Sequence, residues 1–161
     1  MLLVTDYLFL TVTQDYNSSI YDPSPSESHL HSYSYWQFIY SPNYPDNYFD
    51  NANVAWQIHN YYGSHVVLEV VAMDLESCCD MVEIFDGSSR SSPLIARLTG
   101  SNENNGYKYY STSNYMYVLF TSDGSITKKG FQLKYEGTND TSSSSKFTFA
   151  ITRISSFTSR Y

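Results

Sequence analysis

The chain has 161 residues and a formal net charge of −7 at pH 7, a length that fits about one domain. The acidic balance argues against nucleic acid, which is bound through a basic stripe, and against anionic membrane surfaces; a protein partner with exposed Lys or Arg suits it better. Seventeen Tyr and nine Phe among many polar turn residues, without a long helical periodicity, predict an all-β fold.

The first 34 residues are expected to precede the domain. Residues 1–13 are apolar and short, like a secretory signal, but Asp6 interrupts them and neither a basic start nor a clear cleavage site is present. An alternating strand, with Leu8, Leu10 and Val12 on one face, is the favoured interpretation, and an atypical signal peptide stays open as the alternative. Residues 14–34 are rich in Ser, Asp and Pro, which predicts a linker. No run reaches the ~18 apolar residues of a membrane span.

From Tyr35 onward, short apolar segments alternate with turn signals at roughly 8–12-residue spacing, a pattern typical of a sandwich or barrel. The predicted strands are residues 54–59, 66–73, 82–85, 94–98, 107–111, 115–121 and 130–136. The residues expected to face the core are Trp56, Ile58, Val66, Leu68, Val70, Val82, Ile84, Leu94, Met116, Val118, Phe120, Phe131, Leu133 and Tyr135. The domain is expected to span residues 35–136, followed by a Ser-rich tail, residues 137–161, with a short apolar run.

Acidic residues gather at two turns that follow apolar strands. Asp74, Glu76 and Asp80 stand within seven residues, where like charges repel unless a cation or a basic side chain compensates them. A second acidic turn places Asp123 after the strand 115–121. A fold that joins the ends of these strands would gather Glu76, Asp80 and Asp123 around one point. Such an oxygen-ligand site suits a hard cation and favours calcium.

Six motifs follow one another in the predicted domain. They are SPNYP followed by Tyr48, W-x-I, G-S-x-V-x-L, L-E-x-x-x-D-x-V-x-I-x-D-G, S-D-G and G-F-x-L-x-Y. In this order they resemble the CUB domain. The resemblance implies a two-sheet, antiparallel jelly-roll sandwich. It also implies a secreted or cell-surface protein that binds proteins or glycans.

The resemblance further implies a calcium site built around a Tyr, a Glu and two Asp. Matched by motif, these are Tyr48, Glu76, Asp80 and Asp123, with a backbone carbonyl near Ser125. Calcium would hold Glu76 and Asp80 rigid while leaving an oxygen free to pair with a Lys or Arg of a partner. Each residue also has a plainer interpretation: the carboxylates as solvated turn residues, and the tyrosine as one more aromatic covering the sandwich.

The family's disulfides cannot form within this chain, because Val54 and Thr99 stand where the resemblance implies cysteines. The two cysteines, Cys78 and Cys79, are adjacent. Neighbouring Cα atoms are ~3.8 Å apart, below the usual ~4.4–6.8 Å disulfide range. A Cys78–Cys79 bond would therefore be strained and easily reduced, and two free thiols are the simpler expectation. The Cys78–Cys79 bond and an intermolecular bridge stay open as alternatives. Cysteine usage leaves the cellular compartment open.

Two glycosylation sequons begin at Asn17 and Asn139, in polar segments outside the predicted sandwich. They support secretion only weakly, because such triplets also arise by chance.

No enzyme is expected. His29 and His31 share a strand face but lack a third zinc ligand, and Cys79 lacks the orienting group and oxyanion site that a nucleophile needs.

The sequence thus favours an extracellular, calcium-dependent protein-binding module whose acidic loop captures a basic side chain. One alternative is a metal-free glycan-binding or adhesive module that uses exposed tyrosines. Those tyrosines are Tyr61, Tyr62, Tyr107, Tyr109 and Tyr110. The other alternative is a structural spacer from a larger extracellular protein.

Overall fold

The computed structural model describes residues 24–101 and 105–139. The segment expected to be a signal or strand, the sequon at Asn17 and all of the Ser-rich tail beyond Asn139 lie outside these residues. The strands are β1 (Ser26–His31), β2 (Gln37–Tyr40), β3 (Asn53–His59), β4 (His65–Asp74), β5 (Met81–Phe85), β6 (Leu94–Leu98), β7 (Lys108–Tyr110), β8 (Tyr115–Thr121) and β9 (Gly130–Thr138). In the described part of the chain, no helix is long and apolar enough to cross a bilayer.

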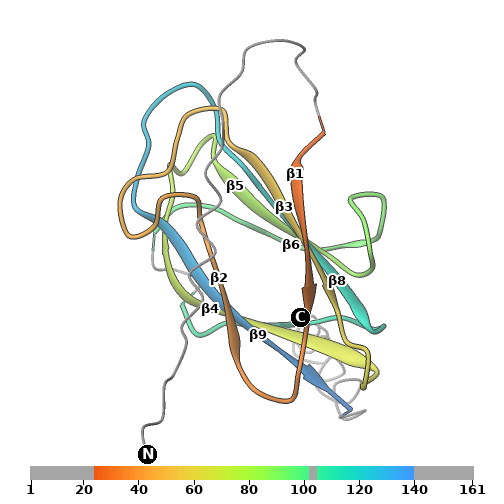
Figure 1. Ribbon diagram of the computed structural model, residues 1–161. Helices are drawn as coiled ribbons and strands as arrows, with labels where there is room; N and C mark the ends of the chain where they lie inside the picture. The colour runs from red at the N-terminus through yellow and green to blue at the C-terminus, as the bar shows by residue number, and fades with distance from the viewer. Residues whose placement is uncertain (1–23, 102–104, 140–161) are drawn as a thin grey trace, which may run out of the picture.

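The strands form two sheets that face each other across a shared interior (Figure 1). One sheet has the order β1-β3-β8-β5-β6 and the other the order β2-β9-β4-β7. The described pairs are antiparallel except β1 with β3, which is parallel. The predicted all-β, two-sheet antiparallel sandwich is therefore confirmed.

The linker predicted for residues 14–34 needs correction over its last part. Ser26–His31 forms β1, an edge strand paired with β3 from Ser26↔Val54 to His31↔His59. Its side chains alternate only between exposed and intermediate, so the segment has no apolar periodicity. Backbone pairing with β3 makes it a strand, and the hydrogen bond from the Tyr117 hydroxyl to Glu27 (3.0 Å) adds an anchor.

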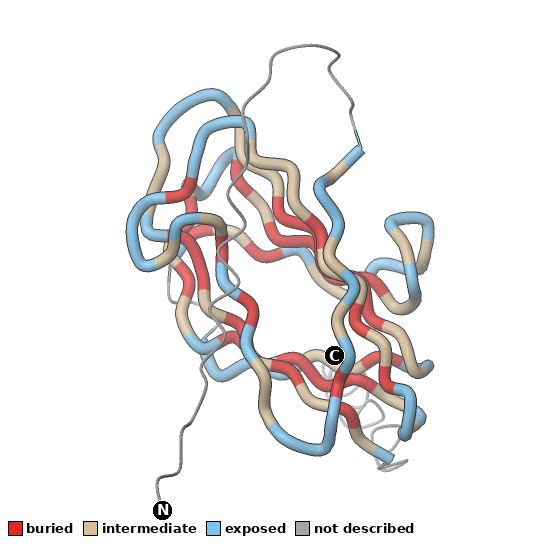
Figure 2. Tube along the Cα trace, in the orientation of Figure 1, coloured by how far each residue is buried: buried red, intermediate tan, exposed pale blue. Residues whose placement is uncertain are grey.

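The core consists of buried residues from both sheets, and Figure 2 shows buried positions along the strands of each. Almost all the residues predicted to face inward belong to it or pack against it. Leu94 is the exception, with 44% of its surface exposed. The β5–β6 register shifts between Ile84 and Phe85. Phe85 therefore pairs with Leu94, whereas an unshifted register would pair it with Ile95. A one-residue shift turns a side chain to the other face of the sheet.

Strand register brings the two acidic turns to one end of the sandwich. β5 pairs with β8 so that Met81 lies opposite Thr121, which places the residues just outside these strands side by side. In the other sheet, Asp74 at the end of β4 lies opposite Gly130 at the start of β9. Both sheets therefore contribute to the same end of the molecule.

Candidate functional site

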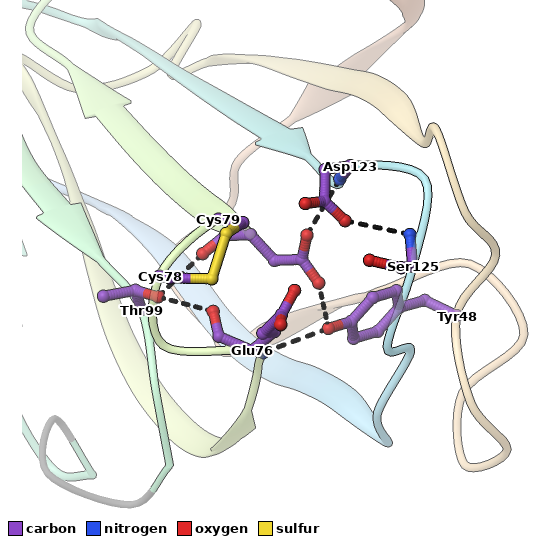
Figure 3. The surroundings of a disulfide bond; sticks show 8 residues. Tyr48, Glu76, Cys78, Cys79, Thr99, Asp123 and Ser125 are labelled. Atoms are coloured by element: carbon purple, nitrogen blue, oxygen red, sulfur yellow. Dashed lines mark hydrogen bonds between the residues drawn. A yellow bond between two sulfur atoms is a disulfide. The ribbon is translucent and has the colours of Figure 1, made fainter.

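Three carboxylates meet at this end of the sandwich. One carboxylate oxygen from each of Glu76, Asp80 and Asp123 lies within 4.8 Å of the other two. Figure 3 shows the site, with Glu76 on the turn after β4 and Asp123 on the turn after β8. Sequence reasoning expected this convergence from the strand ends, and the antiparallel pairing of β5 with β8 produces it.

Asp80 is the centre of the hydrogen-bond network and is fully buried. Its Oδ1 accepts the backbone N–H of Asp123 at 2.9 Å, and its Oδ2 accepts the Tyr48 hydroxyl. The same hydroxyl accepts the backbone N–H of Glu76 at 3.2 Å. Burial, followed by the bond to Asp80, raises the pKa of the Tyr48 phenol, so the hydroxyl stays a donor at neutral pH. Tyr48 thus connects two of the three acidic residues.

Glu76 is the incompletely satisfied member of the group. Its Oε2 is buried and has no hydrogen-bond partner, although a carboxylate removed from water normally acquires one. Burial, and then the charges of Asp123 and Asp80, raise the pKa of Glu76. A cation between the three carboxylates would supply the missing partner and reverse the repulsion. The all-oxygen donor set suits calcium rather than a soft metal.

The remaining predicted ligand, Ser125, lies beside Asp123. Its backbone N–H donates to Asp123 Oδ1 at 2.9 Å, which holds the turn after β8 in a compact form. Lys128 also lies at this end, although no motif of the sequence places it there; its Nζ is 3.7 Å from Asp74 Oδ1. The charge of Lys128 lowers the pKa of Glu76, but this is the smallest of the influences on that group. Lys128 therefore compensates the acidic cluster only in part.

The prediction of free thiols is wrong for the described chain. Cys78 and Cys79 form a disulfide with each other, with an S–S distance of 2.05 Å and Cα atoms 3.7 Å apart. Both lie in the exposed turn between β4 and β5, which directs the two sulfur atoms to the same side (Figure 3). Thr99, at the position where the resemblance implies a cysteine partner, instead places its hydroxyl near the backbone of the turn.

The tyrosines proposed for glycan binding differ in their exposure to solvent. Tyr61, Tyr62 and Tyr107 are exposed, but Tyr109 packs against the core. Tyr62 instead lines a cleft of about 590 Å³ together with Tyr33, Tyr35, Glu136 and Asn139, among others. Exposed Asn139 therefore lies beside a tyrosine-containing cleft at the other end of β9 from the acidic cluster.

The raised pKa of Glu76 predicts how the metal-free protein responds to pH. Because the pKa is higher in the folded state than the ordinary 4.5, folding favours the protonated carboxyl, and stability falls as the pH rises through the folded-state pKa. Calcium-free wild type should therefore be less stable than Glu76→Gln near neutral pH, and the difference should shrink as the pH approaches 4.5. Thermal melts across this range with a chelator present test this. A difference independent of pH would contradict it.

Comparison with known proteins places the chain in a family. Residues 30–135 match the family model of the CUB domain. The chain is 42% identical over 101 residues to bone morphogenetic protein 1 of Xenopus laevis, covering 60% of this chain and 14% of that protein. It is 40% identical over 101 residues to tolloid-like protein 1 of Mus musculus, covering 60% of this chain and 10% of that protein. The chain thus spans only a small part of these relatives.

Solved structures agree on the fold. The extracellular region of zebrafish Gpr126/Adgrg6 matches with a TM-score of 0.61 and 28% identity, over 73% of this chain and 15% of that one. The MASP-1 CUB2 domain bound to Ca²⁺ matches with a TM-score of 0.57 and 23% identity, over 69% of this chain and 99% of that one. CUB domains are a family of extracellular protein-interaction modules. The chain belongs to the CUB family.

Proposed function

We propose that this protein is an extracellular protein-binding module that holds calcium at Glu76, Asp80 and Asp123 and captures a basic side chain of its partner there. The buried, unpartnered Oε2 of Glu76 carries the proposal, because it lies in a cluster of oxygen donors whose like charges need a cation. The MASP-1 CUB2 domain, which shares the fold, is bound to Ca²⁺. This supports the same use of the fold here.

The division of exposure within the cluster favours capture of a cationic group. Asp80 is fully buried, with both carboxylate oxygens already accepting hydrogen bonds. Glu76 and Asp123 are only partly buried, so an oxygen of each can serve both calcium and an approaching ammonium or guanidinium group. Calcium would supply the positive charge that fixes these carboxylates in place. A partner Lys or Arg would then form a charge-assisted hydrogen bond with oxygens that are already oriented.

A binding experiment with small amine probes tests this function. Butylammonium, a lysine side-chain mimic, should shift the NMR amide signals around Glu76 and Asp123 only when calcium is present. Tetramethylammonium, which has no N–H donor, serves as the matched cation and should cause much smaller shifts at the same ionic strength. Equal shifts with both cations, or with and without calcium, would contradict capture of a basic side chain at this site.

The metal-free glycan-binding alternative keeps one supporting observation, the cleft lined by Tyr33, Tyr35 and Tyr62. Tyrosine rings and polar edges are a usual lining for small-molecule sites. Glycan binding that persists in a chelator would favour this alternative.

Glycosylation at Asn17 and Asn139 remains a prediction for material secreted from eukaryotic cells.

A further inference from the structure

The chain segment that follows β6 runs along the acidic turn. Asp74 and Ser101 form an isolated antiparallel bridge, and the backbone N–H of Leu75 donates to the Gly100 carbonyl at 2.9 Å. Gly100 adopts a φ of +73°, which turns the chain in a conformation that favours glycine. Thr99, one residue earlier, is thereby placed against the beginning of the turn that carries the candidate ligands.

The hydroxyl of Thr99 connects the two ends of that turn. Its Oγ1 lies 3.0 Å from the carbonyl oxygen of Glu76 and 2.7 Å from the carbonyl oxygen of Asp80 (Figure 3). A threonine hydroxyl has one proton, so the two carbonyl oxygens share it. The backbone bond across the same turn, from the Asp80 N–H to the Glu76 carbonyl, is 3.4 Å long and thus beyond the usual range. The hydroxyl is the shorter link.

We propose that Thr99 is a positioning residue for the calcium site, an inference that rests on the proposed function. The two carbonyl groups belong to candidate ligand residues, so the hydroxyl sets the separation of the Glu76 and Asp80 backbones without touching the cation. Without metal, the three carboxylates repel one another and tend to open the turn. A turn already held at the binding separation reorganises less when calcium binds. The calcium affinity of the site is therefore higher.

Calcium titration of two matched variants tests this role. Thr99→Val keeps the shape of the side chain and removes the hydroxyl, whereas Thr99→Ser keeps the hydroxyl. Loss of a single hydrogen bond corresponds to a factor of about ten in an equilibrium constant. We therefore expect calcium to bind Thr99→Val about tenfold more weakly than wild type, and Thr99→Ser to bind it nearly as well as wild type. Isothermal titration calorimetry measures both values.

Equal calcium affinity of wild type and Thr99→Val would overturn the inference, and so would a Thr99→Ser variant as weak as Thr99→Val. These outcomes differ from failure of the proposed function, in which the wild type itself binds no calcium. Amide hydrogen exchange without calcium gives a second measurement. The Asp80 N–H should exchange faster in Thr99→Val than in wild type and Thr99→Ser, and unchanged exchange would also count against the role. If Thr99→Val does not fold, Thr99→Ala replaces it in both experiments.

Discussion

Calcium should raise the melting temperature of the wild-type protein substantially, and Asp123→Asn should abolish this gain. A cation that binds only the folded state stabilises it by about 2.7 kcal/mol at a hundredfold excess over Kd, which for a domain of this size corresponds to about ten degrees. The substitution removes one ligand charge while leaving an oxygen to accept the Ser125 N–H. Differential scanning calorimetry with calcium and with a chelator measures the gain.

The calcium-free Asp123→Asn protein should melt no lower than calcium-free wild type, because the Asp123 charge opposes ionisation of Glu76. The matched control is Glu136→Gln, near the other end of β9, which should retain the full calcium response. Magnesium should stabilise the wild type less, since it requires near-ideal octahedral geometry and loses water reluctantly. A wild-type melting temperature that does not respond to millimolar calcium would contradict the metal site.

Truncation of Phe120 should cause the largest loss of stability. Phe120 is fully buried and makes edge-to-face contacts with Tyr48 and Phe131, each at a centroid distance of 5.2 Å. Replacing a buried Phe with Ala costs about 3–5 kcal/mol, because contacts are lost and a cavity remains. Urea unfolding of Phe120→Ala should show a loss of this size. Calcium binding should weaken as well, because Tyr48 packs on the deleted ring.

The matched control is Phe38→Ala, which removes a ring that is 47% exposed. Its effect should stay near the ±0.5 kcal/mol typical of surface positions. If Phe120→Ala does not fold, Phe120→Leu should show a smaller loss in the same direction. A loss for Phe120→Ala no larger than that for Phe38→Ala would show that Phe120 is not part of the core.

Local patterns in the sequence were enough to predict the fold class and the membership of the acidic cluster. Alternating apolar residues such as Ile58 and Leu133 indicate a half-buried strand wherever they occur, because side chains of a strand point to opposite faces. Glu76 and Asp80 precede the start of one strand, and Asp123 follows the end of another. Antiparallel neighbours bring such positions together, so the convergence could be expected before the geometry was known.

The tertiary structure decided what depends on contacts between distant segments. Polar β1 became a strand because β3 offered a free edge, and Leu94 turned outward because of an irregular register. The bonding of Cys78 to Cys79 depended on the shape of the turn that holds them. The pairing of β1 and the outward orientation of Leu94 have no local signal, since the strands that decide them lie elsewhere in the chain. The disulfide, in contrast, joins adjacent residues within one turn.

The candidate site, too, has properties set by the sequence and properties set only by the fold. The sequence alone determined which residue types could bind a hard cation, because carboxylate chemistry is a property of the side chain. Only the fold decided that Asp80 is buried, that the Glu76 Oε2 has no hydrogen-bond partner, and that Thr99 spans the turn between them. Burial and hydrogen bonding are relations between segments far apart in the chain, and they exist only once the two sheets have packed together.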